Sequence, residues 1–109
     1  MKNPLAALPS PPRVSSRFRP RHGTSALCLS DGGQPWESLV VNLSSDYCRL
    51  VWISAKDRLP LSRLRLRNYK GEIVEVAAHA VSTEQSSNVW VVDCQFSDRL
   101  STAEVARLL

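Results

Sequence analysis

The chain has 109 residues, of which 43% are hydrophobic and 22% charged, a composition typical of one small globular domain. This length excludes a second domain of ordinary size. The formal net charge of +4 comes from the N-terminal end, where Lys2, Arg13, Arg17, Arg19 and Arg21 all precede the first acidic residue. We therefore expect any anionic partner to meet this basic segment first.

Residues 1–23 are expected to form a flexible basic arm. Pro4, Pro9, Pro11 and Pro12 forbid a helix and favour extended geometry. The same prolines interrupt the apolar run that a signal peptide needs, and no later run approaches the length of a membrane span. The sequence thus predicts a cytoplasmic protein without membrane insertion.

Residues 24–109 predict a small all-β domain. Short apolar runs alternate with turn residues, and the run "RLRLR" places Leu64 and Leu66 on one face and its three arginines on the other. Six strands at short, even spacing indicate a small antiparallel barrel or sandwich. The expected strands are 24–30, 38–43, 47–54, 63–67, 72–82 and 88–96, with a polar loop over "TEQSSN" between the last two.

The C-terminal stretch "LSTAEVARLL" predicts a short helix. Ser101 with Glu104 three residues later forms a capping box, and Leu100 can pack on Val105 as a hydrophobic staple. Val105 and Leu108 then share an apolar face. Because so short a helix does not persist alone, we expect it to dock on the barrel.

The three cysteines are expected to be buried thiols in a reducing compartment. Cys28, Cys48 and Cys94 lie in separate apolar runs, and no Cys-x-x-Cys motif occurs. His22 and His79 add no metal-ligand spacing. We expect no metal site and no cofactor. No serine or cysteine has a recognisable base, and no pair of carboxylates suggests acid–base chemistry, so we do not expect an enzyme.

Two polar stretches are candidates for a binding site. Arg17 and Arg21 belong to the basic arm, and Asn42 and Ser44 lie where the second expected strand ends. The arginines can grip an anion or simply form a solvated basic tail. The amide and hydroxyl can bond the edge of a purine or cap a tight turn.

The order of these stretches resembles PilZ domains, bacterial receptors for the second messenger cyclic di-GMP. An Arg-x-x-x-Arg motif, Arg17 to Arg21, lies about twenty residues before Asn42-Leu43-Ser44-Ser45-Asp46-Tyr47, which is similar to the family's [Asp/Asn]-x-Ser-x-x-Gly. The closing stretch "VVDCQFSDRLSTAEVARLL" is also similar to the strand and helix that end the family's fold. The resemblance implies a six-stranded antiparallel split barrel over 24–109, with a C-terminal helix and a signal relayed to a protein partner.

The resemblance also implies a role for each matching residue. Arg17 and Arg21 would contact the phosphates and guanine faces of cyclic di-GMP, while Asn42 and Ser44 would read a guanine edge. Tyr47 stands where the family has glycine. Three consequences are open: the side chain blocks the pocket, the turn differs from the family's, or the ring stacks on a base.

Two other functions stay open at this point. The Tyr47 position favours a degenerate adaptor that binds no nucleotide and acts through protein contacts. A third possibility is RNA or DNA binding through the arm. We do not expect nucleic acid to be the partner. The arginine-rich strand with Arg63, Arg65 and Arg67 is a poor nucleic-acid surface, because no aromatic residues alternate with its arginines.

Overall fold

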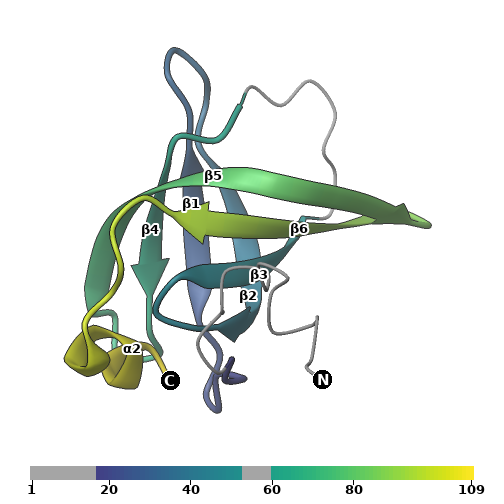
Figure 1. Ribbon diagram of the computed structural model, residues 1–109. Helices are drawn as coiled ribbons and strands as arrows, with labels where there is room; N and C mark the ends of the chain where they lie inside the picture. Colours follow the sequence, from purple (N-terminus) through teal and green to yellow (C-terminus); the bar gives the residue numbers. More distant parts are fainter. Residues whose placement is uncertain (1–16, 53–59) are drawn as a thin grey trace, which may run out of the picture.

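The computed structural model describes residues 17–52 and 60–109, in which six antiparallel strands close into a barrel. The strand order around the barrel is β1-β2-β3-β6-β5-β4, and a short helix lies at one end (Figure 1). The elements are β1 (Ser25–Leu29), β2 (Trp36–Leu43), β3 (Tyr47–Trp52), β4 (Arg63–Arg67), β5 (Ile73–Ser86), β6 (Val89–Phe96) and α2 (Thr102–Leu108). The six-stranded barrel with a C-terminal helix expected from the sequence is confirmed.

Strict alternation of side chains builds the barrel core. In β4, Leu64 and Leu66 are fully buried, while the three arginines that alternate with them face solvent. Arg63 and Arg65 both reach Glu75 on β5, each at 3.4 Å. The inward positions of β1, β3 and β6 follow the same two-residue period. In β2 a register shift between Val40 and Asn42 interrupts the period, and one contiguous apolar cluster fills the barrel.

The ends of two strands differ from the expectation. β5 does not stop at Ser82 but continues to Ser86, because residues 82–86 pair with the start of β6. The predicted loop "TEQSSN" is therefore mostly strand, and it turns at Ser87, whose φ is +57°. Figure 1 shows this β5–β6 hairpin reaching well beyond the barrel. Its side chains are exposed, so apolar periodicity alone could not reveal it.

β2 begins two residues earlier than expected, at Trp36. The Trp36 ring meets the buried Trp52 ring edge to face, with 5.2 Å between centroids. This aromatic pair adds apolar packing where β2 begins and β3 ends.

Helix α2 has the predicted capping box. The Glu104 N–H donates to Ser101 Oγ at 3.1 Å, and the Ser101 N–H donates to Glu104 Oε1 at 2.8 Å. Val105 and Leu108 are buried, and the Thr24 hydroxyl donates to the Leu108 carbonyl. The helix is thereby fixed to the start of β1.

The three cysteines are free and fully buried. Cys48 and Cys94 face each other across β3 and β6, and the hydrogen bond between their thiols together with burial raises the pKa of Cys48. Within residues 17–52 and 60–109, no group of three or more potential metal ligands occurs. The only helix in this part of the chain is much too short and polar to span a bilayer.

Candidate functional site

The segment Arg17–Gly23, here called the strap, runs along the end of β2 before the first strand begins. The Phe18 N–H donates to the Leu43 carbonyl at 2.7 Å, and the Leu43 N–H donates back to the Phe18 carbonyl at 2.9 Å. This two-bond bridge sets the strap antiparallel to β2. The rest of the predicted arm, residues 1–16, lies outside the described residues.

Arg17 is held on the outer face of the barrel by three contacts. Its Nη1 donates to Asn42 Oδ1 at 3.2 Å and lies 3.6 Å from Asp93 Oδ1. Its guanidinium carbon lies 5.3 Å from the centroid of the Tyr47 ring, within cation–π range. The structure therefore brings Arg17 and Asn42, two of the predicted site residues, into direct contact.

A row of polar side chains crosses four strands beneath Arg17. The cross-strand register places Asn42 beside Arg49, Arg49 beside Asp93, and Asp93 beside Ser82. Arg49 Nε and Nη2 donate to the two oxygens of Asp93 at 2.9 and 3.2 Å. The Ser82 hydroxyl donates to Asp93 Oδ2 at 3.1 Å.

Asp93 is the negative centre of this row. The hydrogen bonds from Arg49 lower the pKa of Asp93 and outweigh its partial burial, with smaller contributions from Ser82 and Arg17. The same carboxylate raises the pKa of Arg49. Both groups therefore stay charged at neutral pH and form an ion pair of fixed geometry.

The sequence did not single out Arg49 or Asp93. Each occupies an outward position of its strand, between buried neighbours such as Cys48 and Leu50 or Val92 and Cys94. An outward charge on a strand is common and carries no signal by itself. Only the β3–β6 pairing, which links residues 44 positions apart, shows that the two charges meet.

Ser44 lies beside Asn42, but its hydroxyl is engaged by the turn between β2 and β3. Ser44 Oγ accepts hydrogen bonds from the N–H groups of Asp46 and Tyr47 at 3.2 and 3.0 Å, and it donates to the Tyr47 carbonyl at 3.3 Å. The residue is fully buried. These contacts are those of a turn-capping serine.

The segment that follows β6 also contacts the turn between β2 and β3. The Leu100 N–H donates to the Ser45 carbonyl at 2.8 Å, and Arg99 pairs with Asp46 at 2.8 Å. The segment after β6 thus fixes the turn that carries the second motif.

Tyr47, in the place of the family's glycine, has an ordinary backbone. Among the described non-glycine residues only Ser87 has a positive φ, so position 47 does not need glycine for its conformation. Tyr47 is half-buried and alternates with the inward-facing Cys48, which puts its ring on the outer face under Arg17. Any effect of this residue on a ligand is therefore steric or aromatic.

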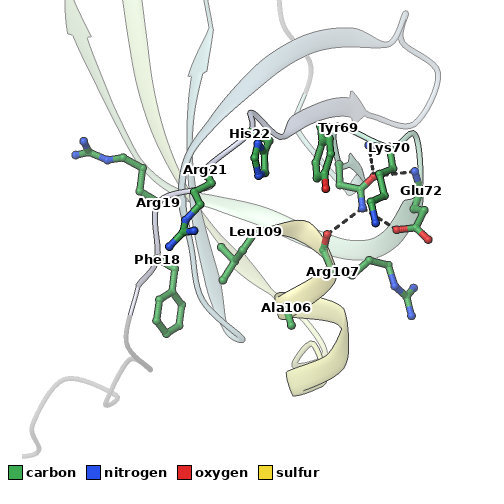
Figure 2. A pocket seen from close by; sticks show the side chains of 11 residues that line it. Phe18, Arg19, Arg21, His22, Tyr69, Lys70, Glu72, Ala106, Arg107 and Leu109 are labelled. Carbon is green, nitrogen blue, oxygen red and sulfur yellow. Dashed lines mark hydrogen bonds between the residues drawn. The ribbon is translucent and has the colours of Figure 1, made fainter.

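Arg21, the other motif arginine, lies elsewhere. It lines a separate pocket with Arg19 and His22 of the strap, the turn between β4 and β5, and the end of α2 (Figure 2). The two motif arginines therefore occupy different places along one strap in this structure.

No family model matches the chain, and no curated protein matches it in sequence. Solved structures do resemble it. MrkH of K. pneumonia in its apo state has a TM-score of 0.64 at 14% identity, covering 84% of this chain and 46% of MrkH. YcgR of Escherichia coli in complex with c-di-GMP has a TM-score of 0.64 at 10% identity, covering 89% of this chain and 42% of YcgR. A further MrkH structure, described as a c-di-GMP-dependent transcription regulatory factor, has a TM-score of 0.53 at 19% identity, with 84% and 46% covered.

These similarities concern the fold. The chain spans less than half the length of each of these proteins. At such low identity the likeness shows that the chain has the PilZ-like barrel expected from its motifs, and it transfers no ligand or partner.

Proposed function

We propose that this chain is a PilZ-like signalling module that binds cyclic di-GMP on the outer face of β2, β3 and β6, under the strap. The observation that carries the proposal is the contact between Arg17 and Asn42, 25 residues apart. It joins the two motifs at one place on a barrel of this fold. The likeness to YcgR, solved with c-di-GMP, supports the same ligand class.

In this proposal Arg17 is the main ligand-binding residue. Its guanidinium can fork onto a phosphate or stack on a guanine. To do so it exchanges its contacts with Asp93 and Tyr47 for contacts with the ligand. Asp93 keeps a counter-charge in Arg49 when Arg17 leaves, which limits the cost of the exchange.

The other three residues contribute differently. Asn42 offers an amide to a guanine edge, as the motif implies. Ser44 supports the site through the turn, and a direct contact with the ligand requires its hydrogen bonds to open. Arg21 reaches the same ligand only if the strap shifts from its present place.

The test is isothermal titration calorimetry with cyclic di-GMP at physiological salt, with GMP and an unrelated oligonucleotide as comparisons. We expect saturable heat with cyclic di-GMP alone. No heat at high ligand concentration would end the ligand assignment and leave the fold untouched. Equal binding of the oligonucleotide, weakening steeply with salt, would indicate nucleic-acid binding instead.

A second function is a nucleotide-free adaptor that works through a protein partner. Two contacts favour it: the Ser44 hydroxyl is already used by its turn, and the Tyr47 ring lies beneath Arg17. In both functions the chain acts by binding rather than catalysis. The two functions differ in the expected effect of removing the Tyr47 ring: only a nucleotide-binding site that the ring obstructs would gain affinity.

A further inference from the structure

A pocket of about 610 Å³ lies between the strap, the turn that joins β4 to β5, and the C-terminal end of α2 (Figure 2). This volume is within the range of small-molecule sites. Arg17, Asn42 and Tyr47 do not line it. It is therefore a different place from the site proposed above.

The buried Asn68 side chain builds the frame of this pocket. Its Nδ2 donates to Glu72 Oε1 at 2.8 Å and to the Arg107 carbonyl at 2.9 Å. Its Oδ1 accepts from the N–H groups of Lys70 and Glu72 at 3.0 and 2.9 Å. One amide thus orders the turn and joins it to α2, so the walls are in place before any ligand arrives.

The strap closes the opposite side of the pocket. The rings of His22 and Tyr69 lie against each other, with centroids 4.4 Å apart. Tyr69 is 56% exposed, and Figure 2 shows its hydroxyl end directed toward α2. The pocket therefore offers a hydroxyl donor beside apolar surface from Phe18, Ala106 and Leu109.

The charge of the pocket is unbalanced. Four cationic side chains line it, and among the described residues none of the four takes part in an ion pair: Arg19, Arg21, Lys70 and Arg107. In contrast, the arginines that do form ion pairs all lie outside it: Arg17, Arg49, Arg63, Arg65 and Arg99. The acidic side chain in the lining, Glu72, accepts a hydrogen bond from Asn68. The pocket thus holds a surplus of positive charge.

The cations are spread around the pocket rather than gathered at one point. Figure 2 shows Arg21 beside Phe18 and Leu109, while the side chains of Arg19 and Arg107 extend outward on opposite sides of the pocket. Long side chains placed this way can fold over an anion that enters between them. Guanidinium groups match the geometry of phosphate oxygens in particular, and a diphosphate gives several of them a partner at once.

We propose that this pocket binds the diphosphate group of a small solute such as a nucleoside diphosphate, separately from the Arg17 site. The phosphates are contacted by four cationic side chains, those of Arg19, Arg21, Lys70 and Arg107. The Tyr69 hydroxyl donates a hydrogen bond to a phosphate oxygen. Phe18 and Leu109 cover the less polar part of the solute. The proposal does not depend on cyclic di-GMP binding.

The test uses inorganic pyrophosphate as the probe, titrated into the whole chain at constant ionic strength and followed by amide NMR. We expect saturable shifts confined to the three segments that line the pocket, residues 18–22, 68–72 and 106–109. The double variant Lys70→Met, Arg107→Gln should bind about tenfold more weakly, the loss expected for charge-assisted hydrogen bonds. The control is Arg67→Gln, which removes one exposed charge at the end of β4, outside the lining of this pocket. Like Lys70 and Arg107, Arg67 forms no ion pair with another described residue.

Three results would overturn the proposal. One is the absence of saturable shifts up to about 10 mM pyrophosphate, since weaker binding carries no specificity. Another is an equal loss in Arg67→Gln, which would indicate general attraction to a basic surface. The third is tighter binding of unrelated oligonucleotides than of pyrophosphate. The experiment involves neither cyclic di-GMP nor Arg17, so its failure is distinct from failure of the proposed function.

Discussion

Arg17 donates a 3.2 Å hydrogen bond to Asn42, although 25 residues separate them in the chain. The strap bridge at Phe18 places the guanidinium there, on the outer face of a barrel whose inside is fully packed. If this face binds cyclic di-GMP, Arg17 is the residue whose loss should weaken binding most.

We expect Arg17→Ala to lower the affinity for cyclic di-GMP at least about tenfold, because it removes a charge-assisted, forked contact. Arg17→Lys should restore only part of it, since an ammonium cannot fork or stack. Titration calorimetry measures both. The matched control is Arg63→Ala, which removes an exposed arginine of β4 that pairs with Glu75 on β5, and it should bind like the parent. Equal affinities for Arg17→Ala and Arg63→Ala would contradict this role.

Removal of the Tyr47 ring should strengthen cyclic di-GMP binding. The ring holds Arg17 by a cation–π contact that a ligand has to displace, and such contacts are worth about 0.5–1 kcal/mol at exposed sites. Tyr47→Gly should therefore bind a few-fold more tightly, while Tyr47→Phe, which keeps the ring, should match the parent. If neither the parent nor Tyr47→Gly gives heat with cyclic di-GMP, the nucleotide-free adaptor is the better function.

Asp93→Asn should lower the free energy of unfolding in a pH-dependent way. The folded-state pKa of Asp93 lies below its ordinary value of 3.8, so its stabilisation is complete above that value and is lost as pH falls through the folded-state pKa. The difference in unfolding free energy between parent and variant should therefore be largest at neutral pH and shrink in acid. Urea unfolding at several pH values measures it. The exposed Asp98→Asn variant controls for the loss of one negative charge, and a difference independent of pH would refute the expectation.

The capping box should contribute measurably to stability. Ser101→Ala removes the acceptor for the Glu104 N–H, at a cost of about 1 kcal/mol in unfolding free energy.

Leu108→Ala removes a fully buried side chain on the inner face of α2 and should lower the free energy of unfolding by about 2–5 kcal/mol. Chemical denaturation measures both, with Ser97→Ala, an exposed serine outside the helix, as the control. A Ser101→Ala variant as stable as Ser97→Ala would show that the cap is dispensable.

The three thiols should be unreactive in the folded protein. All are fully buried, and the pKa of Cys48 is raised by the hydrogen bond with Cys94 and by burial, so little thiolate is present. A colorimetric thiol reagent should react slowly with the native protein. In denaturant it should react with all three thiols, which gives three equivalents of the coloured product per chain. Rapid reaction of one equivalent under native conditions would mean that the barrel opens locally at one of these strands.

Much of the barrel could be predicted, because the patterns that indicate its strands and its helix are formed by residues close together in the sequence. Alternation in β4 and the capping box of α2 depend on residues within a few positions of one another, and both are present as expected. The far end of β5 could not be predicted, because its side chains are polar and only pairing with β6 makes it a strand.

The candidate site also contains residues that could be predicted from the sequence and residues that could not. Arg17 and Asn42 could be named from the sequence because each belongs to a recognisable motif. Asp93 and Arg49 could not, since their meeting depends on β3 lying next to β6 in the barrel. The place of Arg21 depends on the path of the strap, which no local pattern determines.

The strap also has a thermodynamic consequence. It carries Arg17 at one end and Arg21 four residues later, and the Phe18 bridge between them anchors both to the end of β2. A ligand that drew Arg17 away from Asp93 by shifting this anchored segment would also move Arg21, which lines the pocket beside α2. By linkage, an anion in that pocket would change the affinity at Arg17 by the same factor as the reverse. Two anions, rather than one, would then set the conformation of the strap.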